Sequence, residues 1–166
     1  MKSIRFLHRL LPFALLFILA VPAFAQDATS KIMVSSGGYI KSFSGDLNRF
    51  DVPQAYFGGA FAGEAGFALA NLALTWATTE KEEMLFAVIP AIGVRMPPSL
   101  SFFNVFAMAG LGPYWYDKKV SFIIDFAAGA ELHFGGFFLN ITNHIDYMAG
   151  FKYWAYRLMG GIGFAF

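Results

Sequence analysis

The residues best suited to chemistry in this chain are ionisable side chains that interrupt long apolar stretches. They alternate with aromatic and aliphatic residues, so in extended strands they lie on the face opposite the apolar one. Carboxylates, histidines and cations gathered in this way can form ion-paired networks, line a narrow path for ions, or offer ligands to a metal. These residues are Lys41, Arg95, Asp125, Glu131, His133, His144, Asp146 and Arg157.

Four of these residues should meet when neighbouring segments fold into hairpins. Counting back from the turns between segments places His144 opposite Arg157, and Asp125 opposite Asp146. An unpaired charge in an apolar interior is strongly unfavourable, so we expect these side chains to form a hydrogen-bonded network.

The remaining residues of the set fall at other depths. Arg95, Glu131 and His133 lie nearer the tight turns, and Lys41 lies near the opposite rim. Arg95 and Glu131 carry opposite charges and are predicted to pair. The two histidines, His133 and His144, are eleven residues apart on neighbouring segments and at different depths, so their spacing predicts no metal site. No cofactor site is predicted either.

The segments that carry these residues have the two-residue period of β-strands. In 153–166, reading YWAYRLMGGIGFAF, the even positions form an apolar row that ends in Phe164 and Phe166, whereas Arg157 lies on the other face. Segment 137–147 alternates in the same way. The predicted strands are 31–43, 56–63, 67–77, 84–96, 101–116, 120–134, 137–147 and 153–166.

The composition indicates where the apolar faces are placed. The chain has 166 residues, of which 57% are hydrophobic, 19% aromatic and only 14% charged, whereas soluble domains carry about 25% charged residues. Beyond the leader, no run approaches the roughly 20 apolar residues of a spanning helix. The longest runs contain Pro90 or Pro113, and proline disfavours a helix interior. A closed β-barrel is the remaining structure that can span a membrane.

The first 25 residues are predicted to be a cleaved secretory signal peptide, which leaves 26–166 as the barrel domain. Lys2, Arg5 and Arg9 precede an apolar core, and Ala23-Phe24-Ala25 is a small-x-small cleavage pattern. Without the three basic residues of the leader, nine basic and eleven acidic residues remain, a formal charge of −2. No basic patch survives, so no nucleic-acid partner is expected. The chain has no cysteine and therefore no disulfide framework.

The connections between segments sort into two sets. Glu64-Ala65-Gly66, Pro97 to Ser99 and Gly135-Gly136 are tight turns that alternate with the more polar stretches 44–54, 78–83, 117–119 and 148–152. The sequence therefore predicts an all-β fold, an eight-stranded antiparallel up-and-down transmembrane β-barrel. A soluble eight-stranded barrel would have its polar faces outside, which is the reverse of the observed pattern.

In this layout the chain resembles the small eight-stranded outer-membrane barrels, the group that contains OmpX and the OmpA transmembrane domain. The resemblance lies in the leader ending AFA, in AAGAELHF before a tight turn, and in GGIGFAF. It implies location in a bacterial outer membrane, contact with its lipids, and an assembly signal formed by Gly161, Phe164 and Phe166 that the barrel-assembly machinery reads. Met159 departs from the polar residue usual in that signal. We expect a monomer.

The predicted function is structural or surface-interacting, with an interior plugged by ion pairs and no catalysis. An eight-stranded barrel is just wide enough for its own side chains to fill it. The alternatives are a narrow path for small ions, opened by rearrangement of a pair such as Arg95–Glu131, and a pocket or carrier for small hydrophobic molecules. Acyl-transfer chemistry is disfavoured because Asp146 occupies the place near His144 where a nucleophilic serine would be needed.

Overall fold

The computed structural model describes residues 29–44, 55–78, 84–97, 102–116 and 119–166, although the side chains of 39–44, 78 and 153 lie outside the description. The predicted signal peptide also lies outside the described residues and stays a prediction. The strands are β1 (Thr29–Ser44), β2 (Ala55–Ala65), β3 (Ala68–Thr78), β4 (Met84–Met96), β5 (Phe103–Tyr116), β6 (Lys119–Phe134), β7 (Phe137–Met148) and β8 (Tyr153–Ala165).

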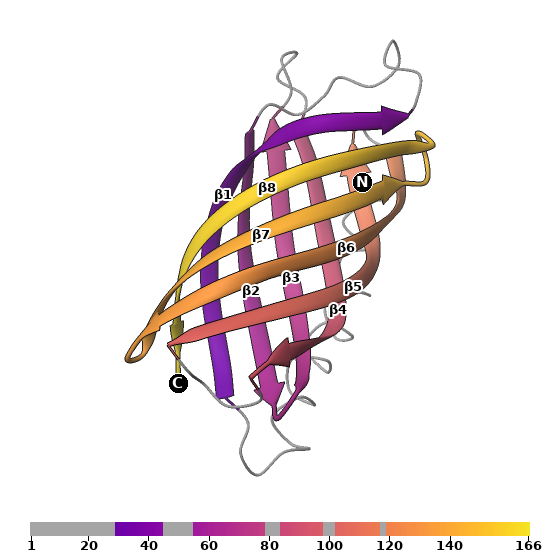
Figure 1. Ribbon diagram of the computed structural model, residues 1–166. Coiled ribbons are helices and arrows are strands. Elements are labelled where there is room, and N and C mark those ends of the chain that lie inside the picture. Colours follow the sequence, from indigo (N-terminus) through magenta and orange to yellow (C-terminus); the bar gives the residue numbers. More distant parts are fainter. Residues whose placement is uncertain (1–28, 45–54, 79–83, 98–101, 117–118) are drawn as a thin grey trace, which may run out of the picture.

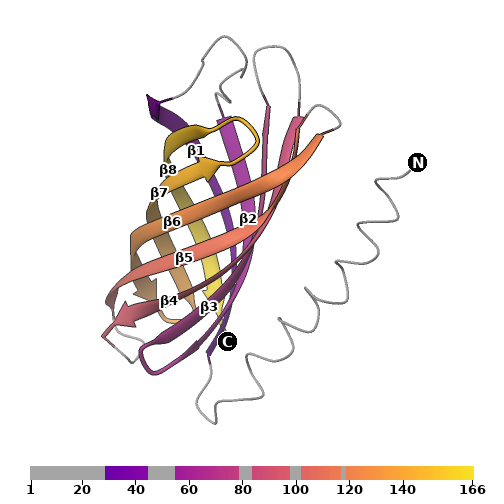
Figure 2. The ribbon, with the colours of Figure 1, turned by 90° about the vertical axis from the view of Figure 1, so that its right-hand side faces the viewer.

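The strands form one closed antiparallel barrel in sequence order, as the alternating pattern predicts. Each strand pairs with its neighbours along the chain, and β1 closes the sheet by pairing with β8, from Lys31 opposite Ala165 to Ser44 opposite Trp154. Figure 1 shows β5 to β8 sloping across the front while β2 to β4 run more steeply behind. The strands tilt strongly against the long axis in Figure 2, as closure of a small barrel requires.

The two faces of each strand have opposite character. On β6, Phe122, Phe126 and Phe134 point outward with about half of their surface exposed, at 58%, 49% and 54%. Their neighbours Asp125 and Glu131 are buried, with 5% and 8% exposed. The predicted orientation is therefore confirmed, and the outward surface is an apolar belt. Within the described part of the chain, no helix is long and apolar enough to cross a membrane.

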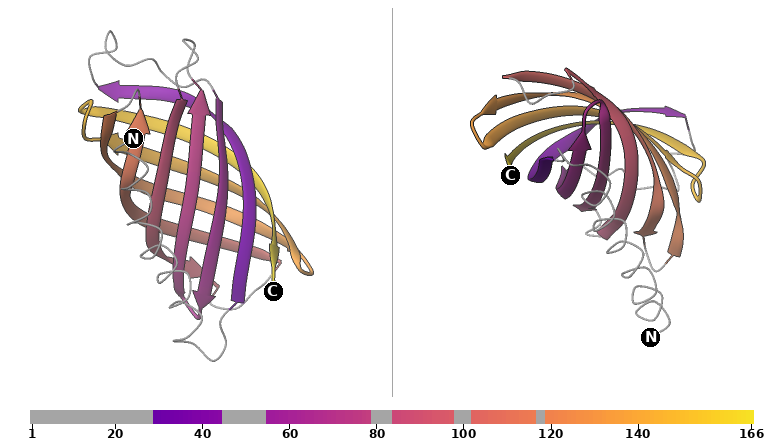
Figure 3. Two further views of the ribbon diagram at one scale, coloured as in Figure 1. Left: turned by 180° about the vertical axis from the view of Figure 1, so that it is seen from behind. Right: turned by 90° about the horizontal axis from the view of Figure 1, so that it is seen from below.

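One end of the barrel is formed by tight turns. Gly66 and Gly135 adopt positive φ angles of 57° and 66°, which glycine tolerates without a Cβ clash. Phe166 exchanges two backbone hydrogen bonds of 2.9 Å with Ser30 at the same end. We call this the tight-turn end, and the opposite end, with the β7–β8 turn Ala149 to Lys152, the loop end. The view from behind in Figure 3 shows β1 to β4 side by side between these ends.

Two strand boundaries differ from the sequence prediction in a way that matters for the interior. The sequence placed Glu64 in a turn, but β2 continues to Ala65, and Glu64 is an inward residue opposite Leu69. The first strand begins at Thr29 rather than residue 31, so Lys31 is its third residue and lies opposite Ala62 of β2 and Ala165 of β8. Backbone pairing keeps these residues in the strands, because Glu64 of β2 lies opposite Thr29 of β1 on one side and Leu69 of β3 on the other.

An apolar cluster fills the interior near the loop end. Tyr114, Tyr116 and Met148 are buried there, and Phe151 from the β7–β8 turn packs against them. The ring centroid of Phe151 lies 5.9 Å from that of Tyr114 and 5.3 Å from that of Tyr116. Below this cluster the interior becomes polar.

Candidate functional site in the barrel interior

The inward charges near the tight-turn end form one network from four strands. Lys31 of β1 places Nζ 2.7 Å from Glu64 of β2 and also donates to Glu131 of β6. Arg95 of β4 lies 2.7 Å from the other oxygen of Glu64, and His133 lies 3.0 Å from Glu131. We call these five residues the Lys31 network. It joins opposite walls of the barrel.

Neighbouring side chains fix the Lys31 network in place. Asn140 of β7 donates to Glu131 at 3.5 Å and accepts a 2.6 Å hydrogen bond from Thr142. The Lys31 ammonium lies 5.1 Å from the Phe138 ring centroid, within cation–π range. Arg95 donates from Nε to the Gly66 carbonyl oxygen at 3.2 Å, which ties the network to the β2–β3 turn.

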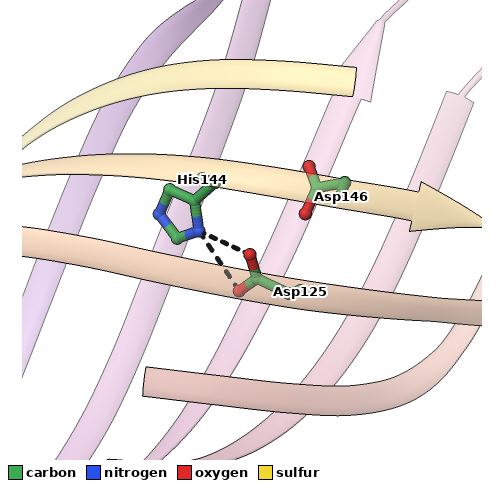
Figure 4. A group of neighbouring side chains, drawn as sticks. All are labelled: Asp125, His144 and Asp146. Carbon is green, nitrogen blue, oxygen red and sulfur yellow. Dashed lines mark hydrogen bonds and ion pairs between the residues drawn. The ribbon is translucent and has the colours of Figure 1, made fainter. Parts of the chain in front are cut away.

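A second network lies between the Lys31 network and the apolar cluster. Arg157 of β8 donates two hydrogen bonds to Asp146 of β7, from Nε to Oδ2 and from Nη2 to Oδ1, the latter at 3.0 Å. Such a bidentate pair is the strongest geometry available to arginine. His144 of β7 contacts both Asp125 oxygens through Nδ1, at 2.9 and 3.1 Å (Figure 4). Arg157 Nη2 lies 3.9 Å from Asp125. These four residues are the Arg157 network.

The Arg157 guanidinium is enclosed on its remaining sides. Its carbon lies 5.1 Å from the ring centroid of Tyr56 on β2, the strand next to β1. Its Nη1 donates to the Met159 sulfur at 3.1 Å. Met159 is thus an inward residue that packs on the network, which accounts for its presence in place of a polar residue on that face.

Asp125, His144 and Asp146 each offer one ligand atom within 4.8 Å of the others, a grouping that a metal can use. Both oxygens of Asp146 are already engaged by Arg157, so the guanidinium supplies the positive charge that a metal would bring. The donor set therefore fits an ion pair better than a metal centre.

The structure brings together most of the residues that the sequence singled out. Seven of the eight lie in the two networks, and the expected strand positions of His144 opposite Arg157 and of Asp125 opposite Asp146 are confirmed by the register. The eighth, Lys41, lies opposite Tyr156 beyond a register shift, and its side chain is outside the described residues.

Sequence reasoning missed Lys31 and Glu64, which hold the centre of the first network. It paired Arg95 directly with Glu131, whereas in the structure Glu64 pairs with Arg95 and shares Lys31 with Glu131. The signal was present, because Glu64 has the inward parity of Tyr56 and Lys31 has that of Met33. Extending the predicted strand 56–63 by two residues would have placed Glu64 inside, and Lys31 already lay at the start of the predicted strand 31–43.

A cavity of about 60 Å³ lies between the two networks. Lys31, Glu64 and Glu131 line it from one side, and His144 and Met159 from the other. Its wall also includes hydroxyl and amide groups from several strands, namely Ser35, Asn71, Thr75, Asn140 and Thr142.

The residues of the predicted assembly signal lie on β8 and just beyond it. Phe164 and Phe166 are exposed, at 41% and 67%, and their ring centroids are 6.3 Å apart. Gly161 points inward, where an added Cβ would lie 2.9 Å from the Val34 carbonyl oxygen. The geometry is that of an outward aromatic pair at the end of the closing strand.

The closed eight-stranded antiparallel barrel, with an apolar exterior and ion pairs inside, is the fold of the small outer-membrane barrels. Solved structures of that class superpose on it. Neisserial surface protein A gives a TM-score of 0.61 at 9% identity, over 82% of this chain and 96% of that one. The N-terminal β-barrel domain of Pseudomonas aeruginosa OprF gives 0.59 at 14% identity, over 85% and 98%. Ail, the attachment invasion locus protein of Yersinia pestis, gives 0.56 at 11%, over 84% and 98%. No family model and no curated protein matches the sequence.

Proposed function

We propose that this chain is an integral outer-membrane barrel of structural or surface-interacting type whose interior is closed to solutes. The main support for this proposal is that the barrel is apolar outside and polar inside, the reverse of a soluble barrel. Aliphatic and aromatic side chains are exposed outside, while the buried polar groups include two ion-paired networks inside. Water would penalise such an exterior, whereas the hydrocarbon of a bilayer accepts it.

The closed interior is supported by three successive layers. Phe151 and the tyrosines of the apolar cluster fill the loop end. The Arg157 network follows, and the Lys31 network fills the tight-turn end. A hydrated ion would have to displace all three layers, and breaking a buried ion pair is strongly unfavourable.

A surface role would place the tight-turn end at the periplasm and the loop end outside the cell. Neisserial surface protein A and Ail, an attachment invasion locus protein, share this fold. In this chain, contacts with a partner would use the connections between strands at the loop end. The same proposal includes recognition of Phe164 and Phe166 by the assembly machinery, a monomeric state in lipid, and no catalysis.

Conductance measurements distinguish the closed barrel from a narrow channel. The refolded protein in planar bilayers should give no discrete current steps, and Glu131→Gln should give none either because the Arg157 network and the apolar cluster remain. Discrete steps in the native protein that change with Glu131→Gln would instead establish the channel. Fractionation of cells expressing the full chain should place it in the outer membrane, and recovery in the soluble fraction would contradict the proposal.

The second alternative, a carrier of small hydrophobic molecules, fits less well. The interior cavity of about 60 Å³ is small beside the roughly 150 Å³ cavity that binds benzene. Enzymatic action on lipid can be tested by mass spectrometry of lipid A, which should be unchanged when the protein is overexpressed.

A further inference from the structure

The wall of the cavity between the two networks has an apolar part and a polar part. One part is apolar, with Leu69, Phe106 and Met108. The other part carries the hydroxyl and amide groups of Ser35, Asn71, Thr75, Asn140 and Thr142. The interior thus brings polar groups from β1, β3 and β7 to one small space, although the sequence separates them widely.

Two polar groups that line the cavity, the side chains of Asn71 and His144, can form further hydrogen bonds. Asn71 is 8% exposed, and its side-chain oxygen accepts no hydrogen bond from the described residues. His144 uses Nδ1 for Asp125, and Figure 4 shows its other ring nitrogen pointing away from that carboxylate. A buried amide oxygen without a donor is unfavourable, so a ligand able to donate to Asn71 would stabilise the fold.

The two ionisable side chains that retain most surface in the networks both line this cavity. His144 and Glu131 keep 13% and 10% of their side-chain surface, against 6% or less for the other network members. One belongs to the Arg157 network and the other to the Lys31 network. A ligand in the cavity can therefore bridge the two networks.

The size and charge of the site define the ligand. A buried water requires about 10–15 Å³ of such volume and two to four polar partners, so this cavity has room for about four waters. A metal or ammonium ion is disfavoured because Lys31 and Arg95 already balance Glu64 and Glu131, and the Lys31 side chain itself lines the cavity.

We propose that the cavity is a binding site for a cluster of buried waters that joins Glu131 of the Lys31 network to His144 of the Arg157 network and donates to Asn71. The waters join the Lys31 network and the Arg157 network into one continuous set of hydrogen bonds in the barrel interior. This set ends below the apolar cluster, so it offers no path across the barrel. This site depends only on the interior geometry and holds whether or not the proposed surface role is correct.

Water-selective nuclear Overhauser spectroscopy of the full barrel in lipid nanodiscs tests the site. The native protein should show cross peaks from long-lived water to the Asn71 side-chain amide and to the His144 ring. Asn71→Leu should abolish the cross peaks at His144, and Thr75→Val, which keeps the side-chain shape, should weaken them at least twofold. The matched control Asn143→Leu changes an exposed residue of β7 and should leave them intact.

Other outcomes overturn the proposal. Native protein without water cross peaks at these two groups, together with xenon-induced shifts at Leu69 and Phe106, would show a dry cavity. Shifts of the Asn71 amide when sodium is exchanged for ammonium would show a cation site. Cross peaks that persist at full intensity in both Asn71→Leu and Thr75→Val would place the waters elsewhere. If Asn71→Leu fails to fold, the native spectrum and Thr75→Val still decide.

Discussion

At the residue scale, Glu131 is the point where the Lys31 network converges. It accepts from Lys31, His133 and Asn140, and only 8% of the residue is exposed. Lys31 and Glu131 are 100 residues apart in the sequence, and their contact crosses the barrel from β1 to β6. A buried pair of this kind is sensitive to loss of one partner but much less to replacement of both.

Glu131→Leu should therefore lower the free energy of unfolding by about 3 kcal/mol, because Lys31 keeps only Glu64 as its carboxylate partner. The double variant Lys31→Met with Glu131→Leu should lose less than the sum of the two single changes. Urea unfolding of the refolded barrel, followed by tryptophan fluorescence, measures both effects. Leu132→Ala, on the outward face of the same strand, is the control. Strictly additive losses would contradict a cross-barrel pair.

Arg157→Lys should lower the free energy of unfolding by roughly 1.5–3 kcal/mol, because an ammonium cannot make the two parallel hydrogen bonds to Asp146. The control is Lys152→Arg, at an exposed residue of the β7–β8 turn, which should change the free energy of unfolding little. Equal effects at the two sites, measured by urea unfolding, would show that the bidentate geometry is unimportant.

At the element scale, β4 and β5 show how apolar runs that contain proline become strands. The pairing of these strands is interrupted between Ala87 opposite Tyr114 and Ala91 opposite Gly110, the stretch that contains Pro90 and Pro113. Proline lacks the backbone N–H that donates to the neighbouring strand, and this accounts for the gap in the β4–β5 pairing at these positions. Close approach of the two backbones is retained by a glycine. A Cβ on Gly112 would lie 1.8 Å from the Val88 carbonyl oxygen.

Gly112→Ala should consequently destabilise the barrel by about 1–3 kcal/mol, since backbone rather than a flexible side chain must move. Gly160→Ala on β8 is the matched control, because its nearest contact would be the Asn140 carbonyl oxygen at 3.9 Å. The urea midpoint of folded protein in detergent reports the difference. Similar midpoints for the two variants would argue against tight β4–β5 packing.

At the scale of the whole molecule, the apolar belt predicts a dependence on depth. Ile141 lies in the middle of β7 and Phe137 at its tight-turn end, and they are 52% and 68% exposed. If the belt contacts lipid, Ile141→Arg should cost about 2–4 kcal/mol and Phe137→Arg about 0–1 kcal/mol. Folding equilibria in lipid vesicles measure the two values. A barrel surrounded by water would tolerate both arginines equally.

Heat-modifiable migration tests closure of the barrel as a unit. The register joins all eight strands, including β1 to β8, so unheated protein should migrate differently from boiled protein in a denaturing gel. Deleting β8 residues 153–166 removes the strand that closes the barrel and should abolish the shift. A native chain with identical migration before and after boiling would contradict a stable closed barrel.

The sequence alone determined the number and order of the strands and the face of nearly every described side chain. This was possible because side chains alternate along any strand, so Phe122 and Asp125 are assigned to opposite faces before any partner strand is known. Strand ends depend on pairing as well as on alternation. Glu64 was placed in a turn because local turn residues follow it, whereas pairing with β3 keeps it in the strand.

Only the tertiary structure decided which inward residues meet across the barrel. Hairpin counting gave His144 opposite Arg157, since that contact depends on one short turn. The contact of Lys31 with Glu131, and the cavity bounded by Asn71 and His144, depend on closure between β1 and β8 and on the tilt of all strands together. Tilt and stagger belong to the closed sheet as a whole and are not written in any single segment.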